Sequence, residues 1–240
     1  MKIAAIIVLF HTEPEDLRNL LRELAHIKQV TPIVVDQSGT KYGYAHGVNV
    51  GLRKAMKQKY DRMIILNPDI SIAGISYATL IAGSSHFGIW GGVMKQHGIQ
   101  YFGGVIDPKR MSGGLNRKKP KNRFTPVDFV TGSFMGIHRS VIETIGMWNE
   151  LYGMYYEDVE YCFRAQKHDI KVGIDTRLLY THFERTVHSI KKEWYLARNR
   201  IYFLLQYGTA EQKKYEFIRM PITIIEYIFK LLLFWIQYPV

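Results

Sequence analysis

Apolar runs alternate with amphipathic stretches through the first third of the chain. Residues 3–10, IAAIIVLF, form a continuous apolar run of strand length, and 32–36 and 62–66 are two more. Between these runs, residues 12–24 carry leucines at helical spacing, and residues 43–58 begin with glycines and become amphipathic. This alternating order predicts an α/β fold with a mostly parallel sheet flanked by helices.

The pattern changes after residue 85. Two short Gly-rich segments, 87–94 and 100–107, are strand-like, and the polar, basic stretch 107–123 is expected to be a mobile loop. Residues 127–146 predict a strand followed by a helix, 155–169 a helix, and 171–182 a last strand, with helix beyond about 186. We therefore expect a catalytic domain over 1–186, divided near residue 85, and a helical extension over 187–240.

Thr12 is expected to cap the first helix, with Pro14 in its first turn. The N-terminal apolar run is short and leads directly into that helix signal, so we interpret it as a strand and not as a signal peptide. The single cysteine, Cys162, excludes an intramolecular disulfide and suits a reducing compartment.

Four acidic or imidazole side chains stand at positions where α/β folds bind ligands. Asp36, Asp69 and His182 each end or follow a predicted strand, and strand ends of this kind gather at one edge of a sheet. Asp69 and His182 could hold Mg²⁺ or Mn²⁺ if phosphate oxygens completed the coordination. Asp158, at a predicted helix start behind two tyrosines, is a candidate general base. A turn Asp and a core His are the alternatives. Glu160 and Arg164, four residues apart, are expected to form a surface pair.

The net charge of +11 predicts a polyanionic partner: nucleic acid, an anionic membrane surface or a phosphorylated substrate. The chain has no GxxxxGK[ST] loop, no GxGxxG after the first strand and no GxSxG elbow, so NTPase, dinucleotide and hydrolase sites are not indicated. A nucleic-acid or membrane-binding module without catalysis is the rival interpretation. We expect no nucleic-acid partner, because no recognised module is present.

From Ile3 to about Tyr207 the chain resembles the family 2 glycosyltransferases, which have the GT-A fold. The resemblance rests on the ordered motifs GYAHGVNVG at 43–51, NPD at 67–69, TGSFMGIHR at 131–139 and YEDVE at 156–160. The chain looks most like the bacterial branch containing rhamnosyl- and galactofuranosyltransferases. The resemblance implies an inverting, metal-dependent glycosyltransferase that moves a hexose from a nucleotide sugar to a saccharide in cell-surface polysaccharide synthesis.

The resemblance also implies roles for individual residues. Asp36 matches the acid that contacts the donor nucleoside, and Asp69 the last acid of the metal-binding D-x-D motif, which here is Asn67-Pro68-Asp69 and lacks its first acid. His182 matches a histidine that completes metal or diphosphate binding. Asp158 matches the catalytic base and Glu157 the acid beside it.

Further matches concern the donor base and the acceptor. Thr12, with His11, replaces the family's usual donor-binding pair, and Gly132 and Ser133 match the segment lining the acceptor side. The expected donor is dTDP-rhamnose, with a UDP-galactose, UDP-galactofuranose or UDP-glucose donor as the alternative. The expected cofactor is Mg²⁺ or Mn²⁺.

The C-terminal segment 220–240 is mostly apolar, with Thr223, Glu226, Lys230 and Gln237 in one narrow polar stripe. Such a stripe predicts a helix lying in a membrane interface, and the basic-aromatic residues at 191–219 favour anionic headgroups. Packing on the catalytic domain or on another subunit is the alternative, which leaves an oligomer through these helices open. A peripheral protein at the cytoplasmic membrane face, acting on a glycan or polyprenyl-diphosphate-linked acceptor, fits these expectations.

Overall fold

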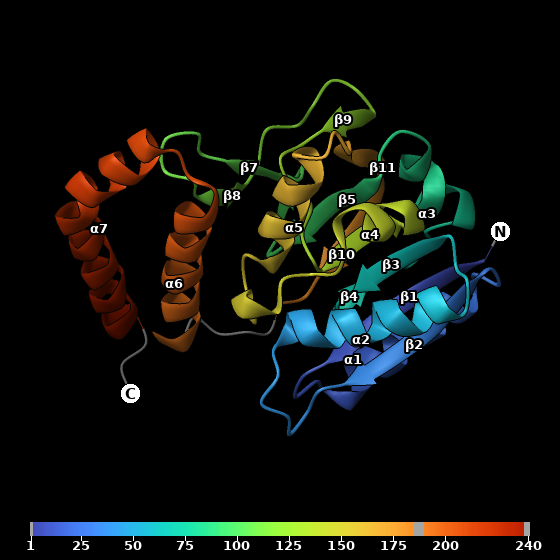
Figure 1. Cartoon of the computed structure of the whole chain (residues 1–240). Coiled ribbons are helices and arrows are strands. Elements are labelled where there is room, and N and C mark those ends of the chain that lie inside the picture. The colour runs from blue at the N-terminus through green and yellow to red at the C-terminus, as the bar shows by residue number, and fades with distance from the viewer. Residues whose placement is uncertain (1, 185–189, 238–240) are drawn as a thin grey trace. The chain divides into compact units, whose positions relative to one another are not determined.

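The computed structural model describes residues 2–184 and 190–237, with side chains described through Glu226 and at Phe229. Figure 1 shows helices packed around a large mixed sheet, followed by two C-terminal helices. The strands are β1 (Ile3–Leu9), β2 (Val30–Asp36), β3 (Arg62–Leu66), β4 (Ile70–Ser71), β5 (Ile89–Gln96), β6 (Ile99–Tyr101), β7 (Gly104–Ile106), β8 (Gly113–Leu115), β9 (Phe124–Pro126), β10 (Phe134–His138) and β11 (Val172–His182). The helices are α1 (Pro14–Ala25), α2 (Tyr44–Lys57), α3 (Tyr77–Ala82), α4 (Arg139–Ile145), α5 (Glu157–Gln166), α6 (Ile190–Tyr207) and α7 (Ala210–Gln237), and two short 3₁₀ turns span Gly83–Ser85 and Glu150–Tyr152.

The main sheet has the strand order β2-β1-β3-β10-β5-β11-β4, with β6 beside β5 and β9 beside β11. β1 runs parallel to both β2 and β3, and β11 runs parallel to β5. β10 is antiparallel to β3 and β5, so the sheet is parallel in its first part and mixed beyond. The carboxyl ends of β1, β2 and β3 consequently share one edge, as the sequence predicted.

The glycines of the 43–51 motif let α2 lie directly on the sheet. A Cβ at Gly51 would stand 2.3 Å from a methyl carbon of Ile6, and one at Gly47 would stand 2.5 Å from Val8. Both partners belong to β1, whose residues 3–7 are completely buried. The spacing of four residues therefore puts two glycines on the helix face that contacts β1.

The chain separates into two compact units: residues 1–105 with 114–185, and residues 106–113 with 186–240. The boundary predicted near residue 186 falls among residues 185–189, which lie outside the described residues. In the described part of the chain, no helix has both the length and the apolarity needed to cross a membrane.

Three sequence-based expectations about local structure are wrong. The N-cap of α1 is Glu13, not Thr12, because Thr12 Oγ1 instead accepts a hydrogen bond from the Phe10 N–H at 3.2 Å. The Glu160–Arg164 pair is not on the surface: Glu160 is buried, and Arg164 also donates to the carbonyl of Met147, which ties α5 to the segment after α4.

The third concerns the stretch 107–123, which is not a continuous loop, since β8 lies within it and pairs with β7. Arg123 makes a two-pronged ion pair of 2.9 Å with Asp175, whose side chain is fully buried. This guanidinium is therefore held by a buried carboxylate and does not belong to a loop that is open along its whole length.

Candidate functional site

A short antiparallel pairing brings Asp69 and His182 together. After β3 the chain turns through residues 67–69 and enters β4, where Ile70 stands opposite His182 of β11. The Phe183 N–H donates to the Asp69 carbonyl at 2.9 Å. As a result, His182 Nε2 lies 3.4 Å from Asp69 Oδ1 although the two residues are far apart in sequence.

Glu23 of α1 holds this short strand in place. Its carboxylate accepts a hydrogen bond from the Ser71 hydroxyl at 2.7 Å and another from the Ile72 N–H at 2.6 Å. A two-residue strand has little pairing of its own, so bonds to a charged acceptor are a substantial part of what fixes it.

Asp158 and Glu157 occupy the first turn of α5 in different environments. Asp158 is partly buried; its Oδ2 accepts the Gly132 N–H at 2.9 Å and its Oδ1 accepts the Val159 N–H at 2.8 Å. Burial raises the pKa of Asp158 above its usual value, although these two N–H groups act in the opposite direction. A carboxylate of raised pKa that is held in one orientation is suited to accept a proton.

Glu157 is buried, and its Oε2 has no hydrogen-bond partner among the described residues. Burial and then the charge of Asp158 raise the pKa of Glu157 well above its usual range. The two neighbouring acids therefore differ, because the Gly132 N–H and the Val159 N–H stabilise the anion of Asp158.

The backbone before these acids is strained. Tyr155 and Tyr156 have φ angles of 68° and 70°, in the left-handed region that L-residues rarely occupy. Such residues cost on the order of 1–3 kcal/mol each and persist where the surrounding structure holds them. These two residues lead directly into α5, whose second residue, Asp158, accepts the Gly132 N–H.

Tyr44, at the start of α2, connects the two halves of the site. Its hydroxyl lies 2.9 Å from Asn67 Oδ1 and 3.0 Å from the Gly132 carbonyl oxygen, and Asn67 Nδ2 lies 3.4 Å from His182 Nε2. Burial and the nearby charges of Glu157, Asp158 and Asp69 raise the pKa of Tyr44 well above its usual value, so this phenol stays a donor. The contacts run continuously from Asp158 to His182.

Asp36 and Thr12 lie in a separate group at the ends of β2 and β1. Asp36 is exposed, and its Oδ1 accepts the Ser38 N–H at 2.8 Å, a bond that lowers its pKa. The Ser38 hydroxyl accepts the His11 N–H at 3.3 Å. This group and Asp69, which follows β3, all lie at the carboxyl edge of the parallel part of the sheet.

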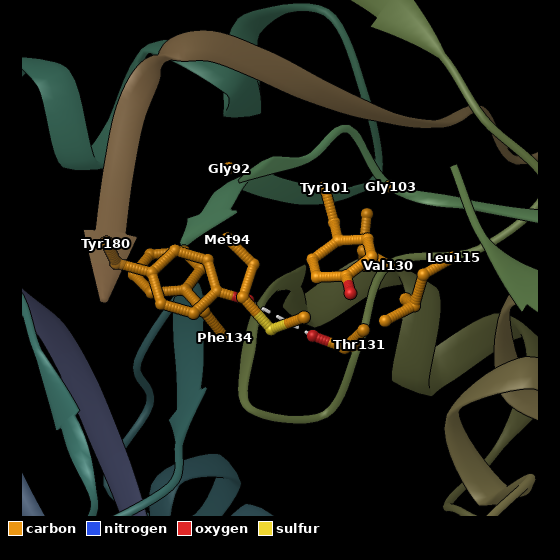
Figure 2. Close-up of a pocket in the computed structure, with 9 residues that line it drawn as sticks. All are labelled: Gly92, Met94, Tyr101, Gly103, Leu115, Val130, Thr131, Phe134 and Tyr180. Atoms are coloured by element: carbon orange, nitrogen blue, oxygen red, sulfur yellow. Dashed lines mark hydrogen bonds between the residues drawn. The ribbon is translucent and has the colours of Figure 1, made fainter. Parts of the chain in front are cut away.

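Three hydroxyl groups meet behind Gly132. Thr131 Oγ1 lies 2.7 Å from Ser133 Oγ and 3.1 Å from the Tyr180 hydroxyl, and the last two are 2.9 Å apart. They adjoin a cavity of ≈ 10 Å³, enough for about one water molecule. Figure 2 shows Tyr101 and Tyr180 on opposite sides of this space, with Met94 and Thr131 between them. Ser133 thus faces this polar cluster and not open solvent.

The donor atoms near Asp69 fit a divalent cation. A carboxylate oxygen and an imidazole nitrogen 3.4 Å apart are close enough to share one ion, and this donor set suits Mn²⁺ with phosphate oxygens as further ligands. His182 Nδ1 is buried without a partner among the described residues, so no hydrogen bond commits Nε2 to carrying a proton. No group of three or more His, Cys, Asp or Glu side chains arranged for a metal occurs in the described ranges, so these two would need the ligand's own oxygens.

Solved structures share this architecture. The structure of GalNAc-T7 with UDP, GalNAc and Mn²⁺ superposes with a TM-score of 0.71 over 90% of this chain and 49% of that one, at 13% identity. The chain has the GT-A glycosyltransferase fold. A second GT-A structure, S. aureus TarS 1–349 in complex with UDP-GlcNAc, gives a TM-score of 0.56 at 15% identity, over 89% of this chain and 69% of that one.

In sequence, the chain is similar to the low-salt glycan biosynthesis hexosyltransferase Agl10 of Haloferax volcanii. The two are 29% identical over 200 residues, which are 70% of this chain and 63% of that protein. No family model matches the chain. The GT-A fold predicted from the motifs is thus confirmed. The predicted similarity to the rhamnosyltransferase branch is not confirmed by these comparisons.

Sequence reasoning did not single out Tyr44, Thr131 or Tyr180. Tyr44 belongs to the 43–51 motif, so its position in that motif was a signal from which it could have been found. Thr131 belongs to the 131–139 motif, whereas Tyr180 carried no such signal, because its position depends on the register of β11 against β5.

Replacing Glu157 with Gln is expected to make stability less sensitive to pH. Folded Glu157, whose pKa is raised, holds a proton that the unfolded chain releases near its usual value of 4.5, so parent stability falls as pH rises through that window. A tenfold difference in proton affinity between the folded and unfolded states corresponds to about 1.4 kcal/mol. The difference in melting temperature, variant minus parent, should therefore grow more positive from pH 4.5 upward.

The matched control is Glu143→Gln on α4, where the side chain is half exposed and pairs with Arg139. Melting curves across a pH series measure both variants. If the difference in melting temperature between Glu157→Gln and the parent stays constant with pH, burial does not raise the pKa of Glu157.

Replacing Gly43 with Ala is expected to destabilise the fold and displace α5. A Cβ there would lie 2.5 Å from the Gly153 carbonyl oxygen, which also accepts the Ala45 N–H at 3.1 Å. Both chain segments would have to move, at a cost of about 1–3 kcal/mol. Gly114→Ala is the control, because nothing lies within 4 Å of its Cβ position. Chemical denaturation should show a lower free energy of unfolding for Gly43→Ala than for Gly114→Ala. Equal stability of the two variants would mean that the segments at Gly43 and Gly153 can move apart without cost.

Proposed function

We propose that the protein is a glycosyltransferase that moves a hexose from a UDP-sugar to a hydroxyl group of a glycan acceptor, with inversion at the anomeric carbon. The observation that carries the proposal is the unbroken set of contacts from Asp158 through Gly132, Tyr44 and Asn67 to His182 beside Asp69. It sets a candidate base and a candidate diphosphate site within one cluster of a GT-A fold.

Asp158 would accept the proton of the acceptor hydroxyl as that oxygen attacks the anomeric carbon. General base catalysis of this kind contributes about 10²–10⁴ in rate. The Gly132 N–H and Val159 N–H fix the carboxylate, so its orientation does not depend on the substrate. Direct displacement by the acceptor needs one base and no enzyme nucleophile, which is why inversion follows.

Asp69 and His182 would hold the divalent cation, with the ion taking the place of the Asn67 amide at His182 Nε2. When bound, the cation would stabilise the negative charge that develops on the departing diphosphate. Asp36, exposed at the end of β2 and of lowered pKa, would remain an anion available to ribose or base hydroxyl and N–H groups.

The comparisons support a UDP-sugar more than dTDP-rhamnose. GalNAc-T7 was solved with UDP and Mn²⁺ and TarS with UDP-GlcNAc, and Agl10 is described as a hexosyltransferase of glycan biosynthesis. A saccharide acceptor, free or linked to a polyprenyl diphosphate at the cytoplasmic membrane face, is consistent with that description. The chain spans less than two thirds of Agl10, so the activity proposed here is that of the segment described.

A panel of nucleotide sugars tests the proposal. UDP and UDP-hexoses are expected to raise the melting temperature of the protein only with Mn²⁺ or Mg²⁺ present, since a ligand at a hundred times its Kd stabilises by about 2.7 kcal/mol. dTDP-rhamnose is the comparison donor. If no nucleotide sugar binds and random single-stranded DNA does, in a salt-dependent way, the protein is a nucleic-acid binder and not a transferase.

A further inference from the structure

Helix α7 turns its polar side chains toward other parts of its own unit. Glu216 is buried, and its carboxylate forms ion pairs with Arg110 at 2.9 Å and with Arg200. Arg110 also lies 3.4 Å from the Thr223 hydroxyl and 3.7 Å from a Glu226 oxygen. Thr223 and Glu226 belong to the narrow polar stripe of the sequence, so this side of α7 is occupied by ion pairs.

The apolar side of the same helix faces solvent. At 100° per residue, the centre of this side lies opposite Glu216 on the helical wheel, where Ile218, Ile225 and Phe229 stand, and Met220 lies at its margin, about 40° from Glu216. The exposed members are Phe217, Ile218, Met220, Ile222, Ile224, Ile225 and Phe229, with exposed fractions from 42% to 75%. This is the reverse of a helix in a water-soluble bundle, which turns its apolar side inward. A contiguous apolar surface of this kind marks an interaction site.

Helix α6 repeats the pattern on a smaller scale. Phe203 and Leu204 are buried, whereas Ile190, Trp194, Ile201, Tyr202 and Leu205 are 41–59% exposed. The segment 186–240 carries eight lysines and arginines against four glutamates, and four of the lysines lie close in sequence to these apolar side chains: Lys191, Lys192, Lys213 and Lys214. Exposed Trp and Tyr side chains beside lysines are typical of helices in a membrane interface.

We propose that α6 and α7 dock the protein on the surface of an anionic lipid bilayer, with the exposed apolar residues of α7 inserted among the acyl chains. The excess of positive charge favours anionic headgroups and opposes pairing of this surface with the same surface of a second copy. The ion pairs of Arg110 fix the rotation of α7, so the helix lies along the bilayer with its polar side on its own unit and its apolar side in lipid. The proposal does not depend on the transferase activity.

Vesicle flotation of the full chain tests this docking. The parent is expected to float with vesicles of phosphatidylcholine and phosphatidylglycerol, to float less with phosphatidylcholine alone, and to lose binding as salt is raised. Ile218→Asp with Ile225→Asp should lower the partition coefficient by at least about tenfold, because two charges would enter the acyl region.

Ile99→Asp in β6 is the matched control: it is an exposed isoleucine outside this unit, and it should float like the parent. The melting temperature of each variant, measured without nucleotide, shows whether the fold is retained, which separates this test from that of the proposed function. A parent that stays at the bottom with anionic vesicles, or a double variant that floats undiminished, overturns the proposal. Light scattering covers the remaining case. If the parent does not float and is a dimer, and the double variant is a monomer, this surface is an interface between copies.

Discussion

Replacement of Asp158 by Asn is expected to lower turnover by about 10²–10⁴ while leaving UDP affinity nearly unchanged. The amide keeps the shape and could still meet the Gly132 N–H through its oxygen, but it cannot accept the acceptor's proton. Because the free carboxylate is the active form and its pKa is raised, the rate of the parent should fall at acidic pH, with a limb lying above the usual value of 3.8.

Initial rates over a pH series, with UDP binding by calorimetry, measure both effects. Glu143→Gln, an exposed carboxyl-to-amide change, should leave the rates unaltered. If Asp158→Asn retains more than about a tenth of parental turnover, given the contribution expected of a general base, the base is another group, and Glu157 is the next to test.

The second large effect concerns the donor site. Asp69→Ala and His182→Ala should each abolish most Mn²⁺-dependent UDP binding, because each removes one of two protein ligands to the proposed ion. The double variant should lose less than the sum of the single changes, with a coupling of about 0.5–3 kcal/mol. Electron paramagnetic resonance of Mn²⁺ in the presence of UDP gives a readout that does not require turnover.

Asp61→Ala and His26→Ala are matched controls, because both residues are exposed, Asp61 directly before β3 and His26 at the end of α1, before β2 begins. Activity that persists in excess EDTA would contradict a role for the metal. If the losses in binding free energy from the two single changes add up in the double variant, Asp69 and His182 do not contact the same ion.

The sequence predicted those features that depend on local pattern. Asp36 and His182 could be placed at strand ends because each ends an apolar run, and the structure has β2 ending at Asp36 and β11 at His182. The contact between Asp69 and His182 was harder to foresee, since it depends on a two-residue strand too short to give a periodic signal. Tyr44 was missed because its partners come from two other segments of the chain.

The environment of charged residues was also difficult to predict from the sequence. Glu160 and Arg164 have the spacing of a surface pair, but whether that helix side meets solvent depends on the segment after α4. For α7, two residues of the predicted polar stripe, Thr223 and Glu226, lie near Arg110, and this partner could not be foreseen from the sequence because it comes from the distant turn between β7 and β8.

The pairing of β4 with β11 has a kinetic consequence. This edge of the sheet is secured by two residue pairs, the Phe183 N–H bond to Asp69 and the Glu23 carboxylate. Because Asp69 directly precedes β4 and His182 ends β11, a ligand that bridges the two side chains also links the two strands. Amide hydrogens at Ile72 and Phe183 should exchange rapidly with solvent deuterium in the free protein and slow down when donor binds, while those of β1 exchange slowly throughout.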